Sequence, residues 1–229
     1  MKIGINRPNF FPWCGFCAIL DAVDIFIILD DIPVGKNNWV TRNRVQDNQG
    51  KTQWMSQSMK TGHLHAVSES ILCDVPDWRN AIKRKLENYY RKAPYFDQYK
   101  AEVFDLILNP QQNLCRYNMA ILEWIIKTLG FNVSIRVSSI MQNDDPSWSP
   151  EKRIIELCKG VSGNQYYNGK DGIEKGLYCA NTFRKEGLRL FKQLYSPSIT
   201  TDLSIIHALF VYGPKTLETI RASCSWEEQ

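Results

Sequence analysis

Apolar and polar positions at the start of the chain follow first the period of a strand, then that of a helix, then that of a strand again. The pattern predicts a strand over residues 2–6, a helix over 14–22 and a second, continuously apolar strand over 25–30. The following residues, 31–50, are rich in Asn, Lys and Arg, and we expect them to form a loop. The chain is therefore predicted to begin with a β-α-β unit, in which polar groups gather at the carboxyl ends of two strands.

The middle of the chain has the spacing of helices. Two strands are predicted before it, over 52–59 and 69–74. Asp77 is suited to cap a helix that ends before Pro94. Further helices are predicted over 96–108 and 113–129, and Gly130 is placed to end the last of them.

Strands and helices alternate again in the final third. The predicted strands are 132–139, 164–168 and 189–194, and the predicted helices are 150–160, 173–187, 203–212 and 215–223. Alternation at both ends of a chain favours an α/β fold with a mostly parallel sheet, flanking helices and a helical central segment. No stretch has the composition of a linker, so residues 1–229 are expected to form one domain with an inserted or capping segment over about 77–130.

Composition and charge limit the classes of function. The formal net charge of +4 permits an anionic small ligand and by itself gives no reason to expect binding to duplex nucleic acid. The longest apolar runs, such as 25–29, fall far short of the ~20 residues that span a membrane. The polar stretch from Asn6 to Asn9 interrupts any signal peptide. We therefore expect a cytoplasmic protein whose seven cysteines are free thiols.

Two carboxylates and a cationic loop mark a candidate site. Asp30 and Asp31 end the second predicted strand, where such a pair can bind a cation, orient a sugar hydroxyl, act as a base or simply accept hydrogen bonds from turn amides. Cations with one aromatic ring suit a phosphorylated ligand that carries a ring. The loop residues concerned are Lys36, Trp39, Arg42, Asn43 and Arg44.

Three other groups of residues have both a chemical and a structural interpretation. Cys14 and Cys17 have the spacing of a thioredoxin motif, but the prolines before them do not fit a thioredoxin strand. His63 can serve as a base, whereas no histidine has zinc-like spacing and no metal is expected. Tyr90 and Arg91 belong to a basic, aromatic helix that either contacts phosphates or forms a solvated face.

Taken together, the motifs of the chain resemble those of the WbqC-like family. The resemblance covers nearly the whole length, in the order in which the family has its motifs. The matching residues are Pro8-Asn9-Phe10, Pro12-Trp13, Gly15-Phe16, Asp30-Asp31, Lys36, Trp39, Arg42-Asn43-Arg44, Gly62-His63, Trp78-Arg79, Tyr90 through Phe96, and Leu203-Ser204.

The resemblance implies a role in O-antigen or other surface-polysaccharide biosynthesis. It implies a transferase that attaches a glycyl or other acyl group to the amine of a nucleotide-linked amino sugar. The chain departs from the family pattern at Asn6, Arg7, Pro33, Thr41 and His207. A catalytic histidine, if the family uses one before Pro-Asn, is missing here, because Asn6 and Arg7 replace His-Gln.

The sequence and the resemblance together predict the site. The candidate catalytic residues are Asp30, Asp31, His63 and Asn9. The candidate substrate-binding residues are Arg7, Trp13, Lys36, Trp39, Arg42, Asn43, Arg44, Tyr90 and Arg91. The alternatives are a non-catalytic protein that binds a nucleotide sugar or carbohydrate, an ATP-dependent ligase and a thiol oxidoreductase. The sequence assigns no cofactor, acyl donor or oligomeric state.

Overall fold

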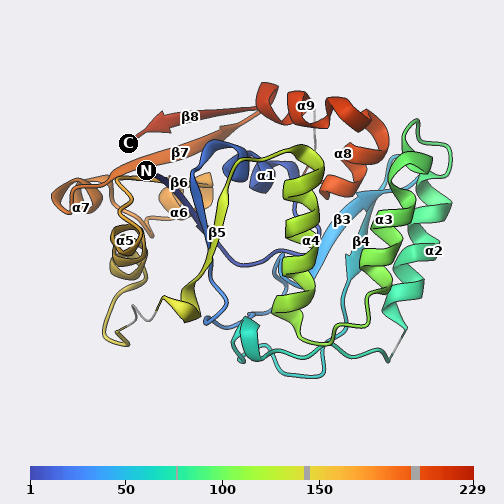
Figure 1. The fold of residues 1–229 in the computed structure, drawn as a ribbon, viewed down its shortest axis with the longest axis horizontal. Helices are drawn as coiled ribbons and strands as arrows, with labels where there is room; N and C mark the ends of the chain where they lie inside the picture. Colours follow the sequence, from blue (N-terminus) through green and yellow to red (C-terminus); the bar gives the residue numbers. More distant parts are fainter. Residues whose placement is uncertain (76, 142–144, 197–201) are drawn as a thin grey trace.

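A six-stranded sheet forms the centre of the fold (Figure 1). The computed structural model describes residues 1–75, 77–141, 145–196 and 202–229. The strand order is β5-β2-β1-β6-β7-β8, and every neighbouring pair is parallel except β7 and β8. The strands are β1 (Lys2–Asn6), β2 (Ile25–Ile28), β5 (Ser134–Val137), β6 (Gln165–Asn168), β7 (Arg189–Tyr195) and β8 (Cys224–Glu228). The predicted fold class, α/β with a mostly parallel sheet and flanking helices, is confirmed.

Helices cover both faces of the sheet, which explains why β2 is apolar at every position. Ile25 and Ile27 join one buried cluster, while Phe26 and Ile28 join the other. The cluster with Ile25 and Ile27 lies against α5 (Pro150–Gly160) and α7 (Ala180–Lys185), beside the short helix α6 (Lys170–Glu174). The larger cluster includes α1 (Cys14–Ala22), α8 (Ile205–Tyr212) and α9 (Thr216–Ala222).

The central segment is helical, as predicted. It contains α2 (Trp78–Tyr90), α3 (Phe96–Leu108) and α4 (Leu114–Leu129). These helices share one buried apolar cluster with the sheet, and α4 lies between the sheet and the α2–α3 pair (Figure 1). The expectation of one domain over residues 1–229 stays a prediction.

The caps read from the sequence have the expected geometry. The Asp77 carboxylate accepts a hydrogen bond from the backbone N–H of Asn80 at 3.2 Å. Gly130 ends α4 with a φ of 69°. Such local signals locate helix ends well, because each depends on residues within one turn.

Three predicted elements need correction, and one strand was missed. Residues 31–50 contain β3 (Arg42–Gln46), which forms an antiparallel hairpin with β4 (Thr52–Ser56). The predicted strand 69–74 is instead a 3₁₀ turn, η1 (Val67–Glu69), followed by isolated bridges. The predicted helix 173–187 is divided into α6 and α7, with Gly176 at a φ of 72° between them. The edge strand β8 was not predicted.

Two further short turns complete the described elements, η2 (Ser138–Ile140) and η3 (Gly213–Lys215). Among the residues that the structure describes, no helix is long and apolar enough to cross a membrane.

Candidate functional site

A cavity of about 880 Å3 opens at the carboxyl ends of β1 and β6. The strand order reverses here, because β2 lies on one side of β1 and β6 on the other. Open α/β sheets bind their ligands at such a switch point. The cavity is lined by Asn6 and Arg7 after β1 and by Asn168 and Gly169 at the end of β6. The sequence correctly predicted that polar groups gather at this edge of the sheet.

Arg7 brings a positive charge to the cavity wall, and no carboxylate of the described residues pairs with it. Its Nη1 atom lies 3.4 Å from the Val34 carbonyl oxygen, and no ion pair with it is found among the described residues. Burial lowers the pKa of the Arg7 guanidinium, and the nearby Tyr178 partly offsets that effect. A partly desolvated guanidinium without a counter-ion makes this wall a suitable place for an anionic ligand.

Asn9 adds a polar group that the surrounding protein does not satisfy. The residue is only 7% exposed and lines the cavity, and its side chain has no hydrogen-bond partner within the described part of the chain. The side-chain amide is open to the cavity rather than sealed within the protein, so it is a candidate to bind a ligand.

Trp13 lines the same cavity and is held by close packing. Its ring meets the Tyr195 ring edge to face, with the centroids 5.1 Å apart. A Cβ atom at position 15 would lie 2.1 Å from the Trp13 ring, so Gly15 is needed for the ring to fold over the first turn of α1. Gly15, two residues after Trp13 in the motif, thus allows Trp13 to form an aromatic wall of the cavity.

The loop between β1 and α1 is fixed by side chains from distant segments. The Asn43 Nδ2 atom donates to the carbonyl oxygens of Phe10 and Phe11, at 3.2 and 2.8 Å. The Ser204 hydroxyl also donates to the Phe11 carbonyl, at 2.8 Å. Phe11 has a φ of 40°, which is unusual for a non-glycine residue. Asn43, predicted to bind substrate, is fully buried and holds this turn.

Asn118, which sequence reasoning missed, ties the same loop to α4. Its Nδ2 atom donates to the carbonyl oxygens of Pro8 and Val40, at 2.8 and 2.7 Å. Its Oδ1 atom accepts a hydrogen bond from Gln57 at 3.2 Å. The residue is fully buried. A polar residue within the apolar stripe of a predicted helix was the available signal.

Asp30 and Asp31 are already engaged with the protein. Asp30 is 4% exposed, and its two carboxylate oxygens accept hydrogen bonds from Ser138 and Ser139 at 2.8 to 3.2 Å. Asp31 accepts from the Ser138 hydroxyl at 2.6 Å and pairs with the Arg153 guanidinium at 2.6 Å. Arg153 lines the cavity. The structure therefore connects Asp31 to the cavity through Arg153.

Tyr90 lies in the core and contacts His207. The Tyr90 hydroxyl accepts a hydrogen bond from the backbone N–H of Gln46 at 3.0 Å and lies 2.9 Å from the His207 Nδ1 atom. Burial raises the pKa of Tyr90 and lowers that of His207 to about 4. The predicted binding residue Tyr90 is thus placed between α2 and α8, apart from the residues that line the cavity.

His207 is expected to make the protein less stable in acid. Its pKa in the unfolded chain, near 6.5, exceeds the folded value, so the unfolded state gains the proton first as the pH falls. This group should lower the free energy of unfolding by about 3 kcal/mol between pH 7 and pH 4. Urea unfolding of His207→Gln should show a flatter pH profile than the parent. The exposed His65→Gln variant should keep the parental profile; parallel profiles for His207→Gln and the parent would contradict this assignment.

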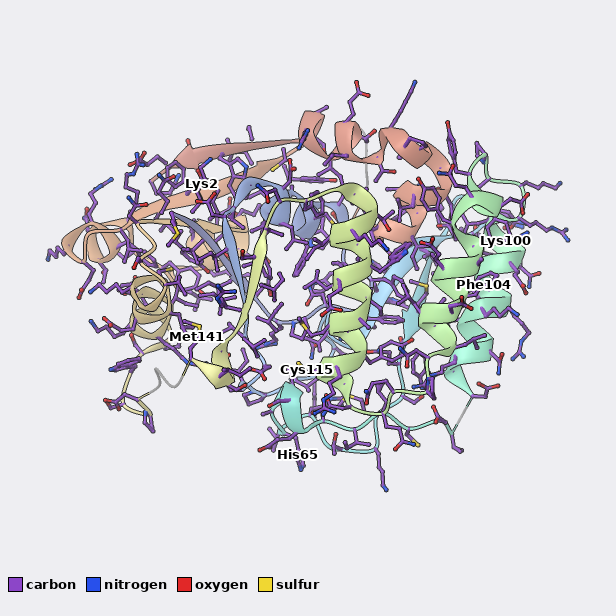
Figure 2. The ribbon with its side chains drawn as sticks, in the orientation of Figure 1. Lys2, His65, Lys100, Phe104, Cys115 and Met141 are labelled. Atoms are coloured by element: carbon purple, nitrogen blue, oxygen red, sulfur yellow. The ribbon has the colours of Figure 1, made fainter. Side chains whose placement is uncertain are left out.

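The remaining predicted residues lie outside the cavity. Arg42 and Arg44 lie on β3, and of the loop residues predicted to bind substrate only Trp39 lines the cavity. Lys36 and His63 border a smaller hollow of about 540 Å3, next to His65, which lies at the lower edge of the molecule in Figure 2. Arg91 is exposed at the end of α2.

The cysteine pair lacks the environment of a reactive dithiol. Cys14 and Cys17 are buried, at 1% and 0% exposure, and no disulfide joins them. Burial raises the pKa of Cys17, and the neighbouring Cys14 adds to the effect. A reactive cysteine needs the opposite shift. In the described residues, no group of three or more His, Cys, Asp or Glu side chains could hold a metal ion.

The fold is that of an α/β protein with a cavity at the switch point of its sheet. The WbqC-like protein family matches residues 7–219, and the chain belongs to that family. An uncharacterized protein of Mycobacterium tuberculosis is 28% identical over 236 residues, which cover 96% of this chain and 97% of the relative. No solved structure matches the chain.

Proposed function

We propose that the protein is a transferase of surface-polysaccharide biosynthesis that attaches a glycyl or other acyl group to the amine of a nucleotide-linked amino sugar. One observation carries the proposal: the cavity at the sheet's switch point combines an Arg7 guanidinium that lacks a carboxylate partner with an Asn9 amide that lacks any partner among the described residues. Membership of the WbqC-like family is consistent with this pathway.

The cavity has the size and the chemistry to hold such a ligand. Its volume lies at the upper end of the range for small-molecule sites. In the proposed complex, Arg7 binds the diphosphate through paired hydrogen bonds, and Trp13 and Trp39 contact the base and sugar rings. Arg7, Trp13 and Trp39 are the members of the predicted binding set that line the cavity, and they are the binding residues of this proposal.

The proposed reaction is direct acyl transfer. The sugar amine attacks the acyl carbonyl, a C–N bond forms, and the bond between the acyl group and its carrier breaks. The carrier leaves with the proton that the amine releases. Asn9 donates a hydrogen bond to the carbonyl oxygen as it gains negative charge. Asp31 is proposed as a positioning residue, because it acts on the cavity through Arg153 rather than directly.

A non-catalytic protein that binds a nucleotide sugar is the second candidate. It is favoured by the engagement of both predicted bases, since Asp30 is bonded to Ser138 and Ser139 and Asp31 to Ser138 and Arg153. Such a protein would use the same cavity and the same Arg7 contact without turnover.

Calorimetric titration with a panel of nucleotide sugars tests the proposal. The panel contains nucleotide amino sugars, the matching neutral nucleotide sugars, free amino sugar, ATP and acetyl-CoA. Selective binding of one nucleotide amino sugar is expected. That complex should gain about 2.7 kcal/mol in stability at a ligand concentration of 100 times its Kd. Absence of binding throughout the panel, with folded protein, would overturn the proposal. Binding without turnover on any acyl donor would favour the second candidate.

A further inference from the structure

Two exposed tryptophans and two half-buried arginines stack together on the β3–β4 hairpin and the loop that leads into it. Trp39 and Trp54 are 37% and 41% exposed, with ring centroids 5.9 Å apart and planes inclined by 35°. The Arg42 guanidinium lies 4.2 Å from the Trp54 ring, and the Arg44 guanidinium lies 5.1 and 5.6 Å from the Trp39 and Trp54 rings. We call these four residues the tryptophan–arginine platform.

The hairpin register explains why these side chains share one face. Arg44 pairs with Trp54 across the two strands, while the intervening Asn43 and Val45 are fully buried. Alternation along β3 therefore directs its arginines to the outer face. Neighbouring exposed tryptophans form an apolar patch of the kind that marks a binding surface. The stacked guanidiniums hold the two rings in place.

The platform carries more positive than negative charge. Arg44 pairs with Asp202 at 3.0 Å, whereas Arg42 donates to the Asn37 carbonyl at 3.1 Å and has no ion pair within the described residues. Lys85 of α2 donates to the Trp54 carbonyl at 2.6 Å, which adds a third cation at the edge of the platform. An anionic partner is thus favoured.

The platform is continuous with the cavity. Trp39 belongs to the platform and also lines the cavity. Asp202, which pairs with Arg44 of the platform, lines the cavity as well. Trp54, Arg42 and Arg44 do not line it. A partner bound on the platform would reach the cavity mouth at Trp39.

We propose that the platform binds the single-stranded 3′ end of an aminoacyl-RNA, which is the acyl donor. Unstacked bases fit exposed indole rings, and the phosphates between them fit guanidinium groups. A neutral glycan would gain nothing from the charge of Arg42. Planar bases stack face to face on indole rings, whereas an acidic glycan packs on them only through its C–H groups. The identification of the RNA as donor rests on the proposed function, whereas binding of the single strand does not.

The chemistry of such a donor balances without a further reactant. An aminoacyl group on RNA is an ester of the terminal ribose. The amine of the sugar forms a C–N bond to the acyl carbon, and the ester C–O bond breaks. The ribose oxygen leaves with the proton released by the amine, so the RNA ends with a free hydroxyl group.

Fluorescence anisotropy with a labelled single-stranded RNA of eight nucleotides ending in CCA tests the proposal. Trp54→Ala should weaken binding about tenfold, with Trp54→Phe in between, because one stacked base loses its ring. Arg42→Ala should weaken binding and reduce the salt slope of log K by about 0.7. Arg116→Ala, which removes an exposed arginine from α4, is the charge-matched control and should leave binding unchanged.

Three outcomes would overturn the proposal. Equal binding of dextran sulfate with no effect of Trp54→Ala would indicate non-specific attraction of polyanions. Equal binding of a blunt RNA duplex would remove the role of unstacked bases. Displacement of the RNA by a neutral oligosaccharide at lower concentration than by unlabelled RNA would identify a glycan surface instead.

The test separates this proposal from the proposed function. Trp54→Ala should keep the parental affinity for the nucleotide amino sugar, since Trp54 does not line the cavity. RNA binding without nucleotide-sugar binding would contradict the proposed function and support RNA binding by the platform. Nucleotide-sugar binding without RNA binding would contradict RNA binding by the platform and support the proposed function.

Discussion

Replacing Arg7 with alanine is expected to weaken binding of the nucleotide amino sugar by about 100-fold. The Arg7 guanidinium lies in a partly desolvated wall and has no carboxylate partner among the described residues. Its main electrostatic interaction is therefore with the bound anion, and losing it raises the Kd. The loss should appear in calorimetric titration as a raised Kd. The effect on the fold should be small, because among the described residues the side chain forms one long hydrogen bond, to the Val34 carbonyl.

Two variants make the Arg7 result specific. Arg7→Lys keeps the charge and loses the fork of donors, so its Kd should lie between those of the parent and Arg7→Ala. Arg116→Ala removes an exposed arginine and should bind as the parent does. A Kd for Arg7→Ala within a factor of about three of the parent, below 0.7 kcal/mol, would show that the anion binds elsewhere.

Replacing Asn118 with alanine is expected to lower the free energy of unfolding by about 3 kcal/mol. The change leaves the buried carbonyls of Pro8 and Val40, and the amide of Gln57, without their shared partner. Urea unfolding followed by circular dichroism measures the loss. Ligand affinity should fall as well, because the freed loop carries Arg7 and Asn9.

Asn88→Ala is the matched control for Asn118→Ala. Asn88 is exposed on α2, so its replacement should change the free energy of unfolding by less than about 0.5 kcal/mol. A loss below 1 kcal/mol in Asn118→Ala would mean that water or another side chain satisfies the two carbonyls, and would remove Asn118 from the support of the site.

The candidate site was predictable where neighbouring residues in the sequence form it. Arg7, Asn9 and Trp13 follow β1 within one short loop, and their place at the cavity follows from the β-α-β order. The other residues predicted for the site lie in different parts of the structure. Lys36 and His63 border the smaller hollow, and Arg42 and Arg44 form part of the platform.

The fold was predictable from its apolar runs and its caps. β2 is apolar on both faces because helices cover both, and that run is visible without any structure. β3 was missed because its buried face carries Asn43, whose amide is satisfied by Phe10 and Phe11 of another segment. No local pattern distinguishes such an asparagine from one in a loop.

The sequence by itself determined most of the strands and helices, though not β3 and β8, together with the WbqC-like motifs and the polar loop after β1. Only the tertiary structure decided which polar side chains remain available to a ligand. Asp30, Asn43 and Tyr90 form hydrogen bonds with residues 32 or more positions away in the chain, whereas Asn9 forms none with the described residues through its side chain. The physical reason is that a hydrogen bond needs both partners in place, and partners from distant segments meet only once the chain has folded.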